Sequence, residues 1–500
     1  MAAQVPGQPA VTDTVPSVEA DESLTSVEAH LAEILGTIRP LAPTELSLSD
    51  AHGLVLAQDI TASVPLPSFD NSSMDGYAVR VADVAATSAR TPVTLPVVAE
   101  VAAGDTGAYA LPPGTAIRIM TGAMLPHGTE AVVPVEWTDG GTARVTIYAP
   151  AERGHALRLT GDDAKAGEVL VSAGTRLRPM HVAVIAATGR SAVRVRPRPR
   201  VVVLSTGSEL AEPGTPIVPG RIWDSNSFMI AAAAREAGCL AYRQSIVPDN
   251  PEEVLPAIED QLVRTDLMIT TGGVSMGGEY DVVKAALRQL GTVRFRKVAM
   301  QPGMPQGFGT VALAPSAAPE ARARRGIIGR LAERGEVAER TVGSAGDGDQ
   351  VPLFTLPGNP VSAYVSFQIF VRPAIGALQA YDGMGLEATR AELTGPLRSP
   401  PGRRSFLRGV LDRSLGQVTP LTGQGSHQVA TLGKANALII VPERVTQMAG
   451  GETVKVLVLP LGHGPGGPHG TRHAPPIVRD KRSLLPLSRY SLLSAIPVRG

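Results

Sequence analysis

The second half of the chain alternates short apolar runs with longer segments whose apolar residues recur at helical spacing. The apolar runs are RVVVL (200–204), LAYRQSIV (240–247), DLMIT (266–270), VRFRKVAM (293–300) and VPLFT (351–355). The helical segments are SFMIAAAAREAG (227–238), the stretch after Asp249-Asn250-Pro251, DVVKAALRQL (281–290) and AYVSFQIFVRPAIGAL (363–378). Asn226 is expected to cap the first of these helices. This alternation predicts a doubly wound α/β domain whose mostly parallel sheet is covered by helices on both faces.

The flanking regions follow other patterns. A helix is predicted over Val27–Ile38 and another over 178–189, whereas TPVTLPVVAEV (91–101) and AVVPVEW (131–137) favour strands. Strands are also predicted for FLRGVL (406–411), ALIIV (437–441) and TVKVLVL (453–459). The chain is therefore expected to be a multidomain α/β protein with β-rich amino-terminal and β-barrel-like carboxy-terminal domains. The expected parts are a disordered tail (1–22), an amino-terminal region (23–195) containing a β-rich subdomain (61–150), the α/β domain (196–388) with a flexible insertion (315–350), the β domain (389–460) and a second disordered tail (461–500).

Composition limits the class of protein. Lys+Arg and Asp+Glu number 46 each, so no net charge attracts nucleic acid or an anionic membrane. The single cysteine, Cys239, cannot form an internal disulfide, which agrees with a reducing compartment. No window is expected to reach the length of a membrane span, and the amino terminus lacks a signal-peptide pattern. These features predict a soluble, cytoplasmic protein with no nucleic-acid or membrane partner.

Small and polar residues directly follow three of the predicted strands, at the edge of the sheet where ligands of such domains bind. They are Thr206, Gly207, Gly272, Gly273, Val274, Ser275, Pro357, Gly358, Asn359, Pro360 and Ser362. Glycine lets a ligand approach the backbone closely, and free N–H groups at a helix start attract phosphate. Each loop alone is weak evidence, but three on one edge predict a nucleotide or phosphorylated ligand.

In the stretch PLPSFDNSSMDGYAVR (65–80), the polar run 70–76 has neither the period of a strand nor that of a helix, and Tyr77-Ala78-Val79 then resumes a strand-like pattern. Its Asp, Asn and Ser residues favour turns, and it ends its polar run on Asp75-Gly76, a strong turn dipeptide. A well-capped surface turn is the simpler interpretation of these residues. A functional loop is the alternative.

Several motifs together resemble the MoeA family of molybdopterin molybdenumtransferases, to which the plant and gephyrin E domains also belong. The motifs are FDNSSMDGYAVR, IRIMTGAMLPHGTEAVV, VVVLSTGSEL, TTGGVSMG, LPGNPVSA and GQGSH, in family order between about 27 and 459. The resemblance implies insertion of molybdate into adenylylated molybdopterin with release of AMP. It also implies an elongated homodimer, a MogA-like α/β domain, delivery of the substrate by a MogA-like adenylyltransferase, and an active site to which the neighbouring subunit presents the Asp75 loop.

The resemblance also assigns residues. By position, the functional residues of the amino-terminal region are Asp75, Thr121, Gly122 and Asp163, and those of the α/β domain are Glu209, Asp249, Asp281 and Lys297. Carboxylate oxygens suit Mg²⁺, which would neutralise phosphate charge, so Glu209 and Asp281 are the expected metal ligands. Each acid could instead cap a helix or face solvent, and Asp249 could be only the N-cap of a helix over 251–263.

Molybdate is an oxyanion, so its pocket calls for arginine, lysine and backbone N–H donors. The expected ligands are Pro305, Arg403, Arg408 and Ser426, with Arg404 in the same arginine cluster. Three departures from the family pattern are clear. Both lysines of its KPGKP loop are replaced, giving Gln301-Pro302-Gly303-Met304-Pro305; Ser208 replaces an aspartate; and one extra residue precedes Asp281. A paralogue that handles another oxyanion such as tungstate, and a non-catalytic scaffold, are the alternatives.

Overall fold

The computed structural model describes residues 24–248, 250–272, 287, 293–312 and 350–460. The predicted helix over 281–290 (except Leu287), the insertion up to residue 349 and both tails lie outside the described residues.

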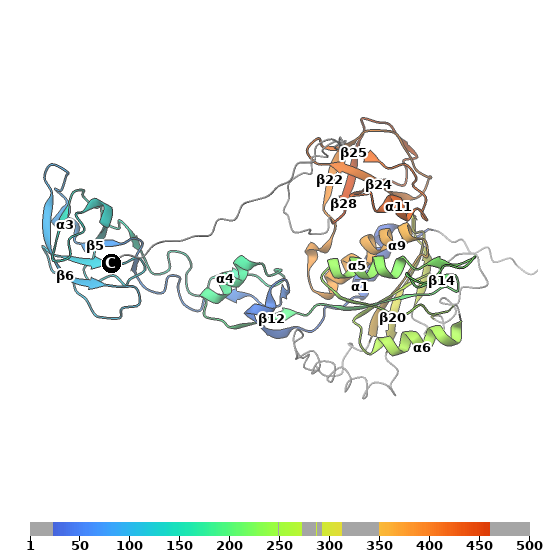
Figure 1. The fold of residues 1–500 in the computed structure, drawn as a ribbon, viewed down its shortest axis with the longest axis horizontal. Helices are drawn as coiled ribbons and strands as arrows, with labels where there is room; N and C mark the ends of the chain where they lie inside the picture. Colours follow the sequence, from blue (N-terminus) through green and yellow to red (C-terminus); the bar gives the residue numbers. More distant parts are fainter. Residues whose placement is uncertain (1–23, 249, 273–286, 288–292, 313–349, 461–500) are drawn as a thin grey trace, which may run out of the picture. The chain divides into compact units, whose positions relative to one another are not determined.

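The α/β domain is built on a six-stranded sheet with the order β16-β13-β17-β21-β20-β18 (Figure 1). The strands are β13 (Arg200–Ser205), β16 (Leu240–Arg243), β17 (Leu267–Thr271), β18 (Arg294–Lys297), β20 (Pro305–Ala312) and β21 (Gln350–Leu356). The first four in spatial order are parallel, and β20 and β18 are antiparallel to their neighbours. The prediction of a mostly parallel sheet is confirmed, although the predicted strand over 293–300 divides into β18 and the short β19 (Met300–Gln301).

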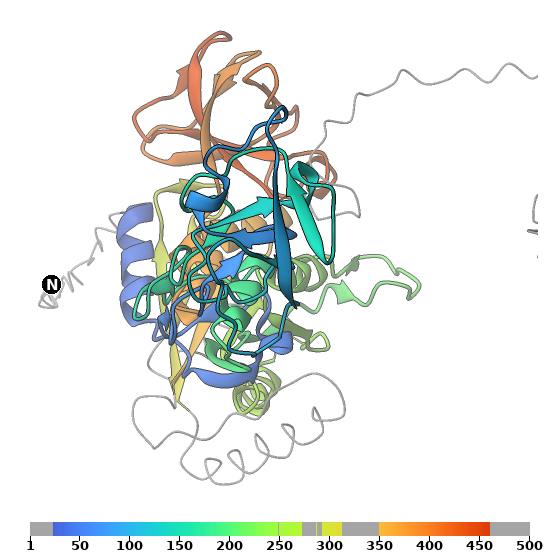
Figure 2. The ribbon, with the colours of Figure 1, turned by 90° about the vertical axis from the view of Figure 1, so that its left-hand side faces the viewer.

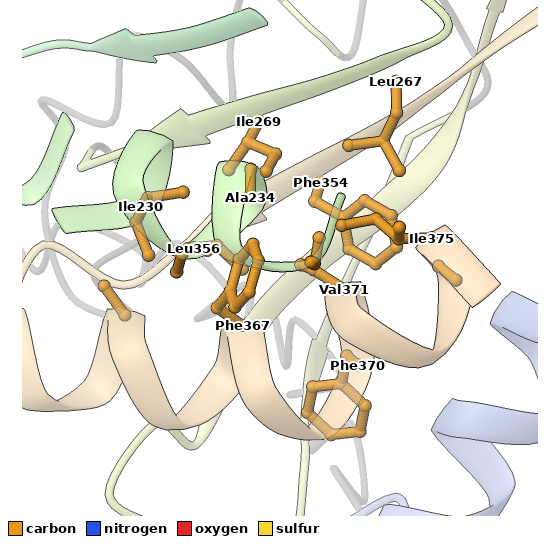
Figure 3. Close-up of a cluster of buried hydrophobic side chains, with 14 of the residues drawn as sticks. Ile230, Ala234, Leu267, Ile269, Phe354, Leu356, Phe367, Phe370, Val371 and Ile375 are labelled. Atoms are coloured by element: carbon orange, nitrogen blue, oxygen red, sulfur yellow. The ribbon is translucent and has the colours of Figure 1, made fainter. Parts of the chain in front are cut away.

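Alternate residues of the central strands enter two different cores, as the two-residue period of a strand requires. Leu267 and Ile269 of β17 pack in one core with α5 (Asn226–Glu236), while Met268 packs in the other with α6 (Pro251–Leu262). Figure 3 shows the first core, where Ile230 and Ala234 of α5 face side chains of the sheet. Helix α1 (Val27–Thr37) also packs in the first core, with α10 (Arg372–Leu378) as its neighbour. The prediction that helices cover both faces is therefore confirmed.

The apolar segment after β21 forms α9 (Pro360–Ser366), a π-helical turn (Phe367–Val371) and α10 in succession. It starts three residues before the predicted helix, because Pro360 is at a first-turn position where proline needs no N–H partner. The 19 residues are long and apolar enough to cross a membrane, so the expectation that no window has that length was wrong. Of its most apolar window, 78% is buried inside the protein, which is typical of a core helix.

Two helix starts differ from the predicted caps. The N-cap of α5 is Ser225 rather than Asn226, and Asp224 Oδ1 accepts the Ser227 N–H at 3.1 Å. The N-cap of α6 is Asn250, whose side chain accepts the Glu252 N–H at 3.1 Å, so Asp249 is not the residue that caps this helix. Each segment has neighbouring residues that are all good caps, Asp224-Ser225-Asn226 and Asp249-Asn250, and the pattern alone could not choose between them.

The amino-terminal region contains a five-stranded sheet with the order β8-β5-β7-β6-β9. Its strands are β5 (Gly76–Val79), β6 (Val93–Val101), β7 (Ala116–Ile119), β8 (Ala131–Pro134) and β9 (Arg144–Ile147). The run AVVPVEW is a strand only in its first half and then becomes a 3₁₀ turn over Val135–Trp137. Shorter elements are β1 (Thr44–Ser47), α2 (Leu48–Ala51), β2 (Val55–Leu56), β3 (Ile60–Thr61), β4 (Asn71–Ser72), α3 (Val81–Val84), β10 (Leu157–Arg158), β11 (Val169–Val171), α4 (Pro179–Ala187) and β12 (Ala192–Arg196).

The carboxy-terminal strands close into a small barrel, drawn in orange and red in Figure 2. Its members are β22 (Ala388–Leu393), β24 (Arg404–Asp412), β25 (Gln417–Pro420), β26 (Ala437–Val441) and β28 (Thr453–Val458). The ring runs β24-β25-β22-β28-β26 and returns to β24. Gly409 lies inside, where an added Cβ would be 2.9 Å from both Ile439 and Val418 side chains. The barrel-like prediction is confirmed; β23 (Leu397–Arg398), β27 (Gln447–Met448) and α11 (Val429–Leu432) complete this part.

Candidate active site

Three glycine-containing loops converge at the carboxyl ends of β13, β17 and β21. The Thr206 N–H donates to the Thr271 carbonyl at 3.1 Å, and a Cβ added to Gly272 would be 2.5 Å from the Thr206 carbonyl oxygen. Gly272 also has φ +96°, so this position requires glycine on two grounds. A Cβ on Gly358 would be 3.6 Å from the Gly272 Cα. The predicted residues of these loops therefore lie together, except that Gly273, Val274 and Ser275 lie outside the described residues.

The loop before α9 is hydrogen-bonded both to α5 and to the loop that contains Ser426. The Asn226 side chain donates to the Gly358 carbonyl at 2.6 Å, and the Asn359 side chain donates to Ser426 Oγ at 3.0 Å. The Val361 N–H donates to the Ser426 carbonyl, also at 3.0 Å. The structure thus places Asn359, predicted to bind the substrate, in contact with Ser426, predicted to bind molybdate.

The segment 301–305 packs on the same helix. A Cβ on Gly303 would be 2.8 Å from Ser366 Oγ and 3.4 Å from the Ser362 carbonyl oxygen. Gln306 Nε2 fixes this turn by donating to the Gly303 carbonyl at 2.5 Å. Two predicted site residues, Lys297 and Pro305, are paired directly across β18 and β20.

The three arginines of the carboxy-terminal cluster, Arg403, Arg404 and Arg408, have different surroundings. Arg408 is 1% exposed, and its guanidinium donates to the carbonyls of Gly423 (2.6 Å) and Gly425 (3.2 Å). Burial lowers the pKa of this guanidinium below its usual range. Arg404 pairs with Glu28 and, at 2.7 Å, with Glu443.

Arg403 is half-buried, and within the described part of the chain its side chain has no hydrogen-bond or ion-pair partner. Of the two arginines predicted to bind molybdate, Arg403 is therefore the one with free donors, whereas Arg408 holds the loop that contains Ser426.

Glu209 follows β13 and is exposed. Its carboxylate folds over Gly207, where an added Cβ would be 2.6 Å from Oε2, so glycine is needed beneath it. Among the described residues the carboxylate has no hydrogen-bond or ion-pair partner, so it is available to a ligand. Asp249 and Asp281, the other predicted acids of this domain, lie outside the described residues.

The amino-terminal candidates gather on three loops of their own region. Asp75 Oδ1 accepts both the Thr121 N–H and the Thr121 hydroxyl at 2.7 Å, and these bonds lower the pKa of the Asp75 carboxyl. The Gly122 N–H donates to the Ser72 carbonyl at 2.8 Å, and Gly122 has φ +78°. Asp163 is exposed, and its N–H donates to the Leu66 carbonyl at 2.9 Å. The Asp75 carboxylate therefore holds the Thr121 loop, 46 positions along the chain, rather than capping its own turn, where Ser72 Oγ accepts the Met74 N–H at 3.3 Å. A functional role for Asp75 stays a prediction.

A part-buried ion network formed by Glu212, Asp224 and Arg243 was not among the predicted site residues. The Asp224 side chain is 1% exposed and accepts hydrogen bonds from the Ser227 N–H and hydroxyl. Arg243 lies 3.7 Å from Asp224, bonds both carboxylate oxygens of Glu212 at 3.0 and 3.1 Å, and stacks 3.5 Å above the Phe228 ring. Because its members come from three separate segments, no local pattern could have revealed it.

Comparison with known proteins agrees with this arrangement. Residues 25–189 match the family described as MoeA N-terminal region (domain I and II), 202–377 the probable molybdopterin binding domain, and 390–459 the MoeA C-terminal region (domain IV). Molybdopterin molybdenumtransferase 2 of Mycobacterium tuberculosis is 40% identical over 437 residues, covering 86% of this chain and 98% of that protein. The molybdopterin molybdenumtransferase of Bacillus subtilis is 33% identical over 421 residues, covering 83% and 89%.

Among solved structures, a molybdopterin biosynthesis MoeA protein from Pyrococcus horikoshii is similar with a TM-score of 0.70. The two chains are 28% identical, and the match covers 87% of this chain and 99% of that one. The resemblance found in the sequence motifs therefore extends over the whole described fold. The chain belongs to the MoeA family of molybdopterin molybdenumtransferases.

Proposed function

We propose that this protein inserts molybdate into adenylylated molybdopterin with release of AMP, the last step of molybdenum cofactor synthesis. The observation that carries this proposal is the meeting of the three glycine-containing loops with the Ser426 loop, through the 3.0 Å bond between Asn359 and Ser426. Ligands of open α/β sheets bind beyond the carboxyl ends of the strands, where these loops lie. Membership of the family supports the reaction type.

The loops suit the phosphate-linked part of such a substrate. Gly272 and Gly358 present backbone rather than side chains, so a diphosphate-like group can approach closely. The Thr206 hydroxyl is buried and has no partner among the described residues, which is expected where a bound ligand completes the hydrogen bonding.

Molybdate would lie beside Ser426, with Arg403 as the free guanidinium and Pro305 and Lys297 on the facing strands. Arg408 keeps the Ser426 loop in place and does not bind the oxyanion in this account. Gln301 and Met304 stand where the family has lysines, so we expect weaker molybdate binding than with a lysine pair.

Mg²⁺ fits this site in part. The Glu209 carboxylate is exposed and without a protein partner among the described residues, as a metal ligand must be. The described residues hold no group of three or more His, Cys, Asp or Glu that could hold a metal, so substrate phosphates would supply much of the coordination. Glu209 and Asp281 would hold the ion, and the ion would neutralise phosphate charge.

A homodimer is part of the proposal, with Asp75 of one chain completing the site of the other. Large apolar side chains are exposed on the amino-terminal loops that contain Asp75, Thr121 and Asp163, which supports a surface covered by a partner there. They are Phe69 (39%), Met74 (40%), Met124 (41%) and Leu159 (49%). A cytoplasmic location and delivery of the substrate by a MogA-like adenylyltransferase belong to the same proposal.

Complementation between two inactive variants tests this arrangement. Asp75→Ala and Glu209→Ala are each expected to abolish molybdate-dependent AMP release. If the site is shared between subunits, re-associated mixtures recover about a quarter of the wild-type activity, because half the dimers are mixed and each has one intact site. No recovery in proven mixed dimers would refute the shared site, while activity in both single variants would refute the assigned roles. Tungstate competition in the same assay separates the molybdate enzyme from the other-oxyanion alternative.

A further inference from the structure

A short two-stranded arm leaves the sheet immediately after Glu209. Its strands are β14 (Leu210–Ala211) and β15 (Ile222–Trp223), which pair in parallel with Leu210 opposite Ile222 and Ala211 opposite Trp223. Figures 1 and 2 show this green arm extending from the α/β domain. The Ile222 N–H donates to the Glu209 carbonyl at 2.8 Å, so the arm begins at the candidate catalytic carboxylate.

The arm is fixed to the domain by ion pairs just beyond its two paired strands. Glu212 directly follows β14, and Asp224 directly follows β15. Both interact with Arg243 of β16, and the Asp224 side chain is 1% exposed. This anchoring limits the movement of the arm relative to the sheet.

On the paired strands, Ala211 and Trp223 are opposite one another, and their side chains share one face. Arg221 directly precedes β15, and Glu209 lies in the turn directly before β14. Trp223 is 49% exposed, although its indole Nε1 donates to the Thr215 carbonyl at 3.0 Å. The polar atom of the ring is thus satisfied and holds the ring, while ring surface remains open to solvent. Arg221 is exposed and uses one nitrogen on the Leu210 carbonyl at 3.2 Å, which leaves other donors for an anion.

An anchored aromatic ring, with a cation two residues before it, lies on the arm that begins at Glu209. This pair is complementary to a planar heterocycle attached to a phosphate. We infer that Trp223 stacks on a fused heteroaromatic ring of the substrate, with Arg221 near its phosphate. This inference rests on the proposed function, since adenylylated molybdopterin carries such a ring at each end, adenine and pterin. Trp223 is thus a substrate-binding and specificity-determining residue of the reaction.

Tryptophan fluorescence tests this inference, because the chain has few tryptophans. The chain has two tryptophans, and replacing the other one, Trp137→Phe, leaves Trp223 as the only tryptophan, whose emission is followed with excitation selective for tryptophan over tyrosine. This variant is titrated with adenylylated molybdopterin, with AMP and with biopterin, while calorimetry measures binding independently. Quenching of Trp223 by AMP assigns the adenine end, and quenching by biopterin assigns the pterin end.

Removal of the ring supplies the second measurement. Trp223→Ala is expected to weaken binding of adenylylated molybdopterin about ten- to a hundredfold, raising KM far more than it lowers kcat. Trp223→Phe should restore most of the affinity, because a phenyl ring still stacks. Tyr242→Ala is the matched control, since Tyr242 is 54% exposed on the same domain and should bind as wild type.

The outcomes separate the two proposals. Calorimetric binding of adenylylated molybdopterin with no change in Trp223 emission, or wild-type affinity in folded Trp223→Ala, refutes the stacking role alone. Absence of binding to the folded wild-type protein refutes both the stacking role and the proposed function.

Discussion

Arg408 provides the sharpest structural prediction. Its guanidinium spans the Gly423 carbonyl at 2.6 Å and the Gly425 carbonyl at 3.2 Å, and its side chain is 1% exposed. Arg408→Lys keeps the charge, but a single ammonium cannot reproduce this fork. Losing one charged hydrogen bond and leaving a buried carbonyl unpaired should lower the free energy of unfolding by about 2–4 kcal/mol.

Urea denaturation followed by circular dichroism measures this change, and calorimetry measures molybdate binding in the same samples. We expect Arg408→Lys to lose stability and to lose molybdate affinity only as the Ser426 loop loosens. Arg403→Gln should leave the free energy of unfolding within about 0.5 kcal/mol of wild type and should lower the affinity for molybdate directly. Arg398→Lys is the exposed control. Wild-type stability of Arg408→Lys together with abolished molybdate binding would show that the guanidinium is a ligand, and the reasoning would be wrong.

Three further predictions follow from local contacts. Gly76→Ala would place a Cβ 2.1 Å from a carbonyl oxygen of β8, so we expect a loss of about 3 kcal/mol or more in urea denaturation, whereas Gly36→Ala on the open side of α1 should be neutral or stabilising. A stable Gly76→Ala protein would contradict this close packing. Thr121→Val removes the hydroxyl that lowers the pKa of Asp75, so that pKa should rise and the acid limb of the pH–rate profile should move to higher pH. An unchanged carboxyl titration by NMR would refute the assigned cause. Burial raises the pKa of the Cys239 thiol to about 12, so thiol reagents at pH 8 should label the native chain very slowly and react with one thiol per chain in denaturant. Rapid native labelling would contradict the buried environment.

Sequence periodicity predicted the architecture well because the apolar pattern reflects burial directly. Alternate residues such as Ile269 and Met268 enter opposite cores, and an uninterrupted apolar strand is the expected result. The same pattern cannot identify which neighbouring polar residue caps a helix, since Asp224, Ser225 and Asn226 are all good caps. Asn226 instead donates to the Gly358 carbonyl, a contact between residues 132 positions apart.

Motifs identified the site loops but not the function of every side chain in them. Arg403 and Arg408 occupy one short motif, yet Arg403 has free donors and Arg408 is buried beneath the Ser426 loop. Burial depends on how β24 closes the barrel, and local sequence does not encode that closure. The Asp224–Arg243 ion pair was missed for the same reason, because it joins residues from separate elements.

The most direct test of the central claim is AMP release from adenylylated molybdopterin by the purified protein, measured with and without molybdate in the presence of Mg²⁺. We expect release that depends on molybdate and yields a cofactor able to activate an apo-molybdoenzyme. Tight binding of the substrate without molybdate-dependent release would contradict it, because the loops would then hold the ligand without supporting insertion.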